Sequence, residues 1–430
     1  MRVVDGLKTR GWAACAVLAA VCTVAAGCGT AGDDNGASGG DVTIEYWTFS
    51  EFTTGEQGDI VKGYINEFET ANPGIKIELV GKPAEDIVSG TVTNAGQGTG
   101  ADVISTQMNA GSSLVYAGLL KDISEEWAAA GAGYTDQFDK DFVDLMGRND
   151  GRWGVPYTAY VTVLYRNLNV LRQAGIDPDQ PIDGWDGWLD QMKQVHDAGF
   201  AGMADPFQSG AERVIQFYAG IPSRTQFDLK DDLKSLLLDQ DALEQAIAFC
   251  QATKEFGSDV AMDTQGEVDL FNANQLAFLP GGPWKYWSFI EADGVEFDIQ
   301  AIPGKAPGAT GGVRGGEFLA ITADSEHPAE AWKFVQFMTD QAQLARFTVP
   351  ISRITGNAAA MQDAAVLESP LNRVSVEAFP GGVNESPLQR QLPPGIAQVF
   401  ADGLVDADTG MPAKEAAAAI IKNYNAALAG

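Results

Sequence analysis

Short runs rich in β-forming residues alternate with longer helical stretches between residues 42 and 119. Val42 to Trp47 alternates polar and apolar residues and predicts a first strand. From Gln57 to Asn72 apolar residues recur at helical spacing, and Pro73-Gly74 ends this helix. Ile75 to Val80 and Asp102 to Ser105 predict two more strands, each followed by a helical pattern. This βαβα order predicts an α/β fold with a largely parallel sheet covered by helices, in which ligands bind at the carboxyl ends of strands.

The second half repeats this alternation less regularly, and no fixed-period repeat is found. The expected elements are helices at Trp185 to Ala198, Asp241 to Phe256, Pro328 to Ala345 and Ala413 to Leu428, and strands at Leu276 to Leu279 and Phe318 to Ile321. A chain of 430 residues is too long for one small core, so we expect two lobes.

The first 27 residues have the pattern of a signal peptide. Three basic residues, Arg2, Lys8 and Arg10, precede an apolar stretch from Gly11 to Ala26 that is short for a membrane span. The stretch ends in Val-Ala-Ala-Gly-Cys28, which resembles a bacterial lipobox, although Ala25 replaces the usual larger aliphatic residue. We expect Cys28 to be lipidated and to become the mature N-terminus. The alternative is an ordinary secreted protein cleaved at an A-x-A-like site.

Residues 28–40 form the expected tether between the lipid and the folded body. After Cys28 the chain contains only Gly, Ser, Asp, Asn, Thr and Ala up to Gly40, which is typical of a flexible linker. Cys15 and Cys22 fall in the signal peptide, so Cys250 is the only cysteine left and no intramolecular disulfide is expected. Cys250 follows apolar residues on a predicted amphipathic helix and is expected to be buried.

The charge and the residue inventory exclude several classes of protein. A formal net charge of −30 excludes nucleic acid as a partner, because phosphate binding needs the opposite sign. Only two histidines, His196 and His327, are present, which does not support a zinc site or a Ser-His-Asp triad, and no Walker motif occurs. Asp406 to Gly410 lacks a third calcium ligand at the proper spacing. We therefore expect a protein that is not an enzyme and that carries no cofactor and no metal.

Five segments in fixed order resemble a known family. They are Phe68 to Ile75, Ala101 to Ile104, Gly154 to Tyr157 with Leu164 to Asn167, Leu276 to Trp284, and Gly315 to Ile321 before the helix with Ala331 to Phe334. Together they are similar to the family 1 extracellular solute-binding proteins of ABC importers, the family to which maltose-binding protein belongs. Arg166 interrupts a usual Tyr-Asn pair, and Leu279 to Gly281 replace a common Ala-Met.

The resemblance implies a two-lobe periplasmic-binding-protein fold (class II) with the ligand in the cleft between the lobes. Three crossovers are expected, near Tyr157, Gly308 and Ile351. Lobe 1 is then 41–157 plus 309–350, and lobe 2 is 158–308 plus 351–430. The resemblance also implies a monomer at the outer face of the cytoplasmic membrane that delivers its ligand to membrane-embedded ABC permease subunits.

The expected ligand is a carbohydrate. A site for a sugar needs aromatic side chains that stack on the sugar faces and polar groups that hydrogen-bond the hydroxyls. Trp284 follows Gly-Gly-Pro and matches a family position whose indole stacks on sugar, although Trp287 one turn later allows a core role instead. Trp47 and Glu51 lie at the end of the first strand, where the parallel-sheet rule places the cleft. Trp47 could equally pack under the loop, and Glu51 could be merely solvated.

Further polar residues complete the expected site. They are Thr106, Gln107, Asn109, Tyr157, Tyr160, Gln208, Arg314 and Glu317. Thr106 to Asn109 suit hydroxyl recognition but also suit a helix N-cap, and the glycines beside Arg314 and Glu317 either admit ligand or make a turn. Tyr165 and Asp102 are expected to be structural.

The expected ligand is a di- or oligosaccharide. A polyol, a glycerophosphodiester or a polyamine would also suit a binding protein of this kind, and a secreted carbohydrate-active enzyme is the candidate from a different class.

Overall fold

The computed structural model describes residues 41–430 except 145–146, 149–150, 208–210, 226–227, 230–234, 259–263, 385–395 and 430. The predicted signal peptide, Cys28 and the predicted tether lie outside the described residues, as does Gln208.

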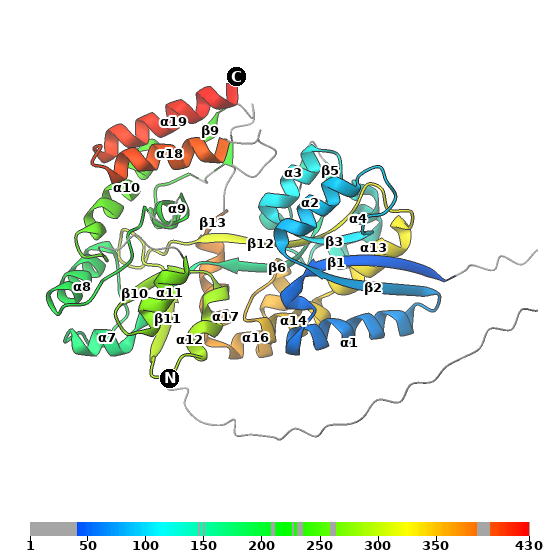
Figure 1. The fold of residues 1–430 in the computed structure, drawn as a ribbon, viewed down its shortest axis with the longest axis horizontal. Coiled ribbons are helices and arrows are strands. Elements are labelled where there is room, and N and C mark those ends of the chain that lie inside the picture. The colour runs from blue at the N-terminus through cyan, green and yellow to red at the C-terminus, as the bar shows by residue number, and fades with distance from the viewer. Residues whose placement is uncertain are drawn as a thin grey trace, which may run out of the picture. The chain divides into compact units, whose positions relative to one another are not determined.

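The larger sheet contains the predicted parallel strands. β1 (Val42–Phe49) pairs in parallel with β2 (Ile75–Lys82) on one side and with β3 (Val103–Gln107) on the other. β12 (Val313–Ile321) lies antiparallel to β3 and to β6 (Val155–Val161), and β13 (Val383–Asn384) pairs in parallel with the start of β12. All nine residues of β12 are buried. This central strand therefore joins the βαβα half of the sheet to the later part of the chain (Figure 1).

A first group of helices accompanies the larger sheet. α1 packs against α14 and η1, and its apolar residues, among them Val61, Tyr64 and Phe68, are buried. The elements are η1 (Ser50–Phe52), α1 (Gly55–Ala71), α2 (Ala84–Asn94), α3 (Met108–Tyr116), α4 (Ser124–Ala130), α5 (Ala132–Thr135), α6 (Lys140–Val143), the short strands β4 (Gly147–Arg148) and β5 (Gly151–Arg152), α13 (Pro328–Met338), α14 (Gln341–Ile351), α15 (Ala358–Met361) and α16 (Ala364–Glu368).

A second, antiparallel sheet has β7 (Val163–Asn167) at its centre, with β10 (Phe278–Gly281) and β11 (Phe297–Ala301) on its two sides. The accompanying elements are α7 (Leu168–Gln173), α8 (Trp185–Asp197), α9 (Ala211–Ala219), β8 (Asp228–Leu229), β9 (Leu236–Leu237), α10 (Gln240–Lys254), α11 (Thr264–Asn272), η3 (Pro283–Lys285), α12 (Tyr286–Ile290), α18 (Ile396–Asp408) and α19 (Ala413–Ala429). α17 (Pro370–Ala378) and η4 (Phe379–Gly381) follow α16.

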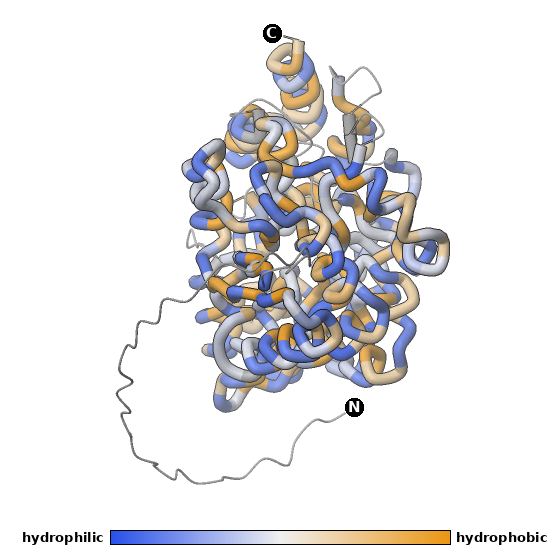
Figure 2. The backbone as a smooth tube through the Cα atoms, turned by 90° about the vertical axis from the view of Figure 1, so that its right-hand side faces the viewer, coloured by the Kyte–Doolittle hydropathy of each residue, from blue (hydrophilic) through white to orange (hydrophobic). Residues whose placement is uncertain are grey.

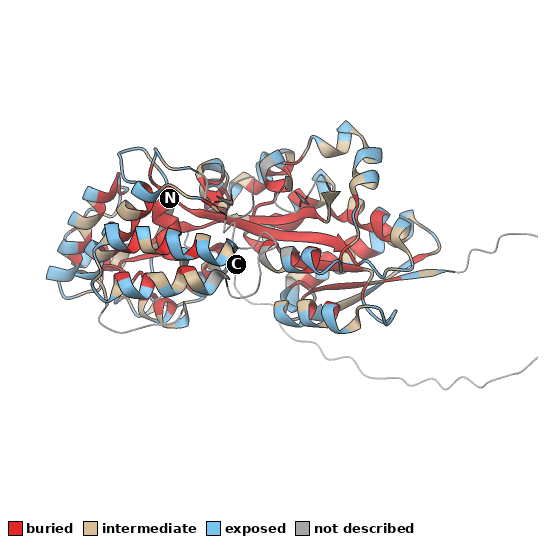
Figure 3. Ribbon diagram, turned by 90° about the horizontal axis from the view of Figure 1, so that it is seen from above, coloured by how far each residue is buried: buried red, intermediate tan, exposed pale blue. Residues whose placement is uncertain are grey.

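The buried side chains divide into separate clusters that follow the two sheets. One cluster packs around the larger sheet, and two others pack around the smaller sheet and the helices from α7 to α12, α18 and α19. Figure 3 shows the strands as buried ribbons and the exposed residues on the outer sides of helices. Hydrophilic and hydrophobic residues alternate along the helices in Figure 2, as expected for helices that bury one face.

The two sheets connect where two segments of the chain meet. β6 ends at Val161 and β7 begins at Val163, so Thr162 passes from one sheet to the other. The Thr162 amide donates to the carbonyl of Val313 at 2.9 Å, and the Val313 amide donates to Thr162 Oγ1 at 2.9 Å. Gly312 has φ +131°, and a Cβ there would lie 2.9 Å from the Thr162 carbonyl oxygen, so this meeting point requires glycine.

The last passage of the chain between the two sheets lies at α17. Residues of α15 and α16, namely Ala360, Met361 and Val366, still pack in the cluster of the larger sheet, whereas Leu371 of α17 packs in a cluster of the smaller sheet. The predicted residue bounds of the two lobes stay a prediction.

Two details differ from the sequence expectation. The predicted helix from Pro328 to Ala345 is two helices, α13 and α14, because Asp340 caps the second one by accepting from the Ala342 amide at 3.0 Å. Parallel pairing does not extend to the smaller sheet, which is antiparallel.

Cys250 is buried in α10, as expected, and burial raises the pKa of its thiol.

Candidate ligand-binding site

The carboxyl ends of β1 and β3 lie at one edge of the larger sheet, because the two strands are parallel. β1 ends at Phe49 and leads into η1, which carries Glu51, while β3 ends at Gln107. A pocket of about 430 Å³ opens here, lined by Phe49, Ala84, Glu85, Val88, Thr106, Gln107 and Ala110. The pocket therefore lies at the carboxyl ends of parallel strands, where the sequence analysis predicts that the ligand binds.

Arg353, which follows α14, connects two of the predicted site residues. Its Nη1 donates to Glu317 Oε1 at 2.6 Å, and its Nη2 donates to Glu51 Oε1 at 2.9 Å. Glu317 lies in β12, where it pairs with Gln107 of β3 and Thr158 of β6. The carboxylates of Glu317 and Glu51 outweigh the effect of burial and raise the pKa of Arg353, so its guanidinium stays charged.

An aromatic pair extends the site toward the smaller sheet. Trp284 of η3 meets Tyr160 of β6 edge to face, with ring centroids 5.1 Å apart. The indole of Trp284 folds back over Gly282, where a Cβ would lie 2.1 Å from the ring. Trp284 is 43% exposed and Trp287 is 41% exposed, so neither is a core residue. The core role for Trp284 is thereby excluded, and a large apolar face remains open to solvent.

Three other predicted residues are packed inside the protein. Trp47 is 3% exposed, its indole N–H donates to Glu45 Oε1, and the Lys82 ammonium lies 4.1 Å from its ring centroid. Tyr157 is fully buried and stacks on Phe347 with ring centroids 4.8 Å apart. Thr106 lines the pocket but is also buried.

The remaining predicted residues are spread over the same region. Gln107 is exposed and stands at the N-cap position of α3. Asn109 lies in α3, but its side chain is outside the described residues. Arg314 is buried, donates through Nε to Asn384 Oδ1 at 2.6 Å and lies over the Phe379 ring.

The glycine beside Glu317 serves packing rather than ligand access. A Cβ on Gly316 would lie 2.3 Å from the carbonyl oxygen of Thr158 on the neighbouring strand. The residue is therefore glycine because β12 and β6 approach each other closely.

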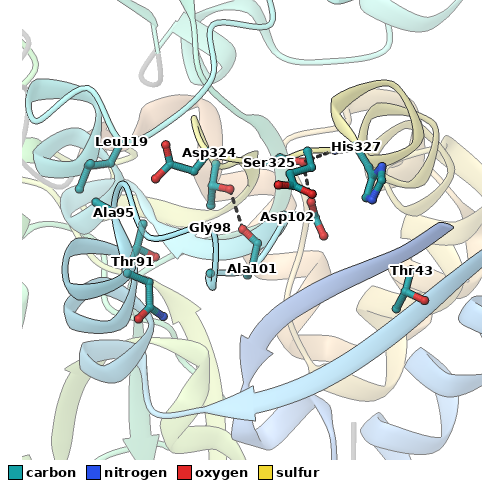
Figure 4. Close-up of a pocket in the computed structure, with 14 residues that line it drawn as sticks. Thr43, Thr91, Ala95, Gly98, Ala101, Asp102, Leu119, Asp324, Ser325 and His327 are labelled. Carbon is teal, nitrogen blue, oxygen red and sulfur yellow. Dashed lines mark hydrogen bonds between the residues drawn. The ribbon is translucent and has the colours of Figure 1, made fainter.

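Asp102 and Tyr165 are structural, as the sequence predicts. Asp102 precedes β3 and accepts from Ser325 Oγ at 2.6 Å and from the Glu45 amide at 2.9 Å. It lines a different pocket, of about 180 Å³, shown in Figure 4, whose polar groups hold the α13 loop against β1. Tyr165 is fully buried, and its hydroxyl donates to the Gly282 carbonyl at 3.0 Å, behind Trp284.

Sequence reasoning missed Arg353. Its two partners lie 36 and 302 positions away in the chain, so no local pattern marks it. Ser352, with φ +52°, turns the chain after α14, and reciprocal hydrogen bonds between Ile354 and Ala159 then lay this segment on β6.

Metal-binding clusters and membrane-spanning helices are both absent from the described part of the chain. No three His, Cys, Asp or Glu side chains there are grouped so that they would hold a metal ion. No helix in the same residues is both long and apolar enough to cross a membrane.

Known proteins with similar folds and sequences agree with this architecture. The cyclic alpha-maltosyl-1,6-maltose binding protein from Arthrobacter globiformis has a TM-score of 0.77 at 17% identity, covering 90% of this chain and 99% of that one. UgpB from Mycobacterium tuberculosis in complex with glycerophosphocholine has a TM-score of 0.71 at 18% identity, covering 91% and 99%. The multiple sugar-binding protein of Streptococcus mutans is 24% identical over 345 residues, covering 71% of this chain and 73% of that protein.

These similarities confirm the predicted fold class, an α/β fold of the two-lobe periplasmic solute-binding type. The model of the bacterial extracellular solute-binding protein family matches residues 63–373, and the chain belongs to this family. It is therefore an extracellular solute-binding protein of the kind that serves ABC transporters, as the five sequence segments predict.

Proposed function

We propose that this protein captures a di- or oligosaccharide and delivers it to the permease subunits of an ABC importer. The observation that carries the proposal is the exposed side chain of Trp284, which contacts Tyr160. The Tyr160 phenol is close enough to Arg353 to help raise its pKa, and Arg353 donates to the Glu51 carboxylate. An apolar plate beside a hydrogen-bond acceptor matches the two kinds of surface that a sugar presents.

The polar part of this site also suits a sugar. Glu51, Gln107 and Tyr160 are at least partly open to solvent, and each offers a group that hydrogen-bonds a hydroxyl. Tyr160 belongs to β6 of the larger sheet, and Trp284 follows β10 of the smaller sheet. A ligand that covers this aromatic pair would contact both lobes and favour their closure around it.

A non-sugar solute is the second candidate. The similar structure of UgpB with glycerophosphocholine favours a glycerophosphodiester over a polyol or a polyamine. A secreted carbohydrate-active enzyme is the least favoured, because the family and the similar structures are binding proteins.

A ligand array tests the choice between these candidates. The mature protein, residues 28–430 with Cys28 replaced by Ser, is heated with neutral sugars, polyols, polyamines and phosphodiesters in separate wells. We expect neutral oligosaccharides to raise the melting temperature, with dissociation constants of about 1 μM, and to be recovered unchanged. Stabilisation by glycerophosphocholine alone would favour the second candidate, and recovery of cleaved sugar would favour the enzyme.

We also propose that a lipid on Cys28 anchors the protein to the outer face of the cytoplasmic membrane. The lipobox-like sequence before Cys28 supports this. Cys28→Ala is expected to release the protein into the medium, because a signal peptide without a lipidated cysteine leaves no anchor. Cell fractionation measures the outcome, with Cys250→Ala as the matched control, and continued membrane retention of the Cys28 variant would contradict the anchor.

A further inference from the structure

The charged group at the centre of the site is already neutralised by its neighbours. Each terminal nitrogen of Arg353 donates to a carboxylate, Nη1 to Glu317 and Nη2 to Glu51. Its side chain is only 11% exposed, and its guanidinium carbon lies 5.5 Å from the Phe52 ring centroid. A phosphate needs N–H donors that are not committed to other anions.

The two carboxylates that Arg353 holds are in different surroundings. The side chain of Glu317 is 4% exposed, whereas that of Glu51 is 55% exposed. Within the described residues, Arg353 holds Glu51 through Oε1, which leaves Oε2 of this exposed carboxylate for other donors. Glu317 therefore fixes Arg353 from inside the protein, and Arg353 fixes Glu51 with one oxygen available to a ligand.

We propose that Arg353 is a positioning residue that holds Glu51 as an acceptor for ligand hydroxyls, and that the site selects an uncharged polyhydroxy ligand over one that carries phosphate. The inference rests on the proposed function, since it requires that Glu51 faces the ligand. A carboxylate fixed at one oxygen accepts hydrogen bonds from hydroxyl groups with little loss of side-chain entropy, whereas a freely solvated carboxylate must first be ordered.

The other charges near the site have the same effect. Glu85 lines the pocket at the end of β3 and adds a further negative charge. Of the nearby cations, Lys82 lies over the Trp47 ring and Arg314 donates to Asn384. Among these described residues, a phosphate would thus meet carboxylates, which repel it, and cations that already have partners.

The variants that test the proposal are Arg353→Met, Arg353→Lys, Glu51→Gln and the double variant Arg353→Met with Glu51→Gln. Arg346→Met is the matched control, because Arg346 lies in α14 and pairs with Glu67 at 3.1 and 3.2 Å in an exposed position. Calorimetry with maltotriose, sn-glycerol 3-phosphate and glycerophosphocholine measures selectivity. Crystal structures of the unliganded parent and of Arg353→Met measure the position of Glu51 without any ligand.

We expect maltotriose to bind the parent and the two phosphate compounds not to bind. Arg353→Met and Glu51→Gln should each weaken maltotriose binding about tenfold or more, and the double variant should be little weaker than either single one. Arg353→Lys should recover part of the loss, and Arg346→Met should bind like the parent. In the Arg353→Met crystal the Glu51 carboxylate should leave its position.

Three results would overturn the inference: tight binding of either phosphate compound by the parent, unchanged maltotriose affinity in Arg353→Met, or an unmoved Glu51 in its crystal. If no sugar binds the parent, the carbohydrate proposal fails instead, and the crystal structures still decide whether Arg353 positions Glu51. If Arg353→Met does not fold, Glu51→Gln and Arg353→Lys still test the affinity and the selectivity.

Discussion

Trp284→Ala is expected to weaken sugar binding about ten- to a hundredfold, a loss of roughly 1 to 3 kcal/mol of binding free energy. Trp284 is 43% exposed without ligand, so removal of its indole takes away a surface that the ligand would cover and leaves the core intact. Titration calorimetry measures the affinity, and denaturant unfolding measures the stability of the same sample. The free energy of unfolding should stay within about 1 kcal/mol of the parent, the usual range for a change outside the core.

Two other tryptophans provide matched controls for Trp284. Trp188 is fully buried among Phe217, Phe249 and Phe278, so Trp188→Ala should cost roughly 3 to 5 kcal/mol of stability. Trp287 is about as exposed as Trp284, but its ring meets Tyr286 of the same helix, so Trp287→Ala should bind sugar like the parent. A Trp284→Ala protein that unfolds like the Trp188 variant, or that binds sugar normally, contradicts the stacking role.

The sequence was most informative where local patterns determine structure. The strand and helix patterns from Val42 to Ile104 agree with β1, α1, β2 and β3, because alternation and helical spacing act over a few residues. The two-helix arrangement of α13 and α14 was missed, since Asp340 reads as an ordinary surface residue until its cap is seen.

The site was less predictable because its contacts join distant segments. Trp284 and Glu51 were accessible to reasoning, since one follows a Gly-Gly-Pro turn and the other follows a strand. Trp47 and Tyr157 are aromatic, like residues that stack on a ligand, and only the packing in the folded protein shows that they are buried. Arg353 reaches Glu51 across 302 positions of sequence, which no periodicity records.

A buried group of charges lies directly behind Trp284. Glu267 of α11 accepts from Arg213 Nη2 at 3.1 Å through Oε1 and from Lys285 Nζ at 3.3 Å through Oε2. All three side chains are at most 6% exposed, and Arg213 also donates to the Pro280 carbonyl at 2.7 Å. One carboxylate thus holds two cations from α9 and η3 together.

Glu267→Ala is therefore expected to lower the free energy of unfolding by roughly 3 to 5 kcal/mol, because it leaves two buried positive charges without their shared carboxylate. Glu67→Ala is the matched control: it breaks the exposed pair with Arg346 and should cost about 1 kcal/mol or less. Denaturant unfolding of both variants at neutral pH measures the difference. Equal small losses in the two variants would show that the buried carboxylate contributes no more than a surface one.

The pH dependence of the Glu267→Ala variant gives an independent check of the cause. Burial lowers the pKa of Lys285 even in the parent, and Glu267 opposes that shift, so the variant should lower this pKa further. Between the folded pKa and the ordinary lysine value of about 10.4, the unfolded chain binds more protons than the folded one. Stability of the variant relative to the parent should then rise as the pH is raised through this window. Because Lys285 adjoins Trp284, the variant should also bind sugar less tightly, and this loss should diminish over the same pH range as Lys285 loses its proton.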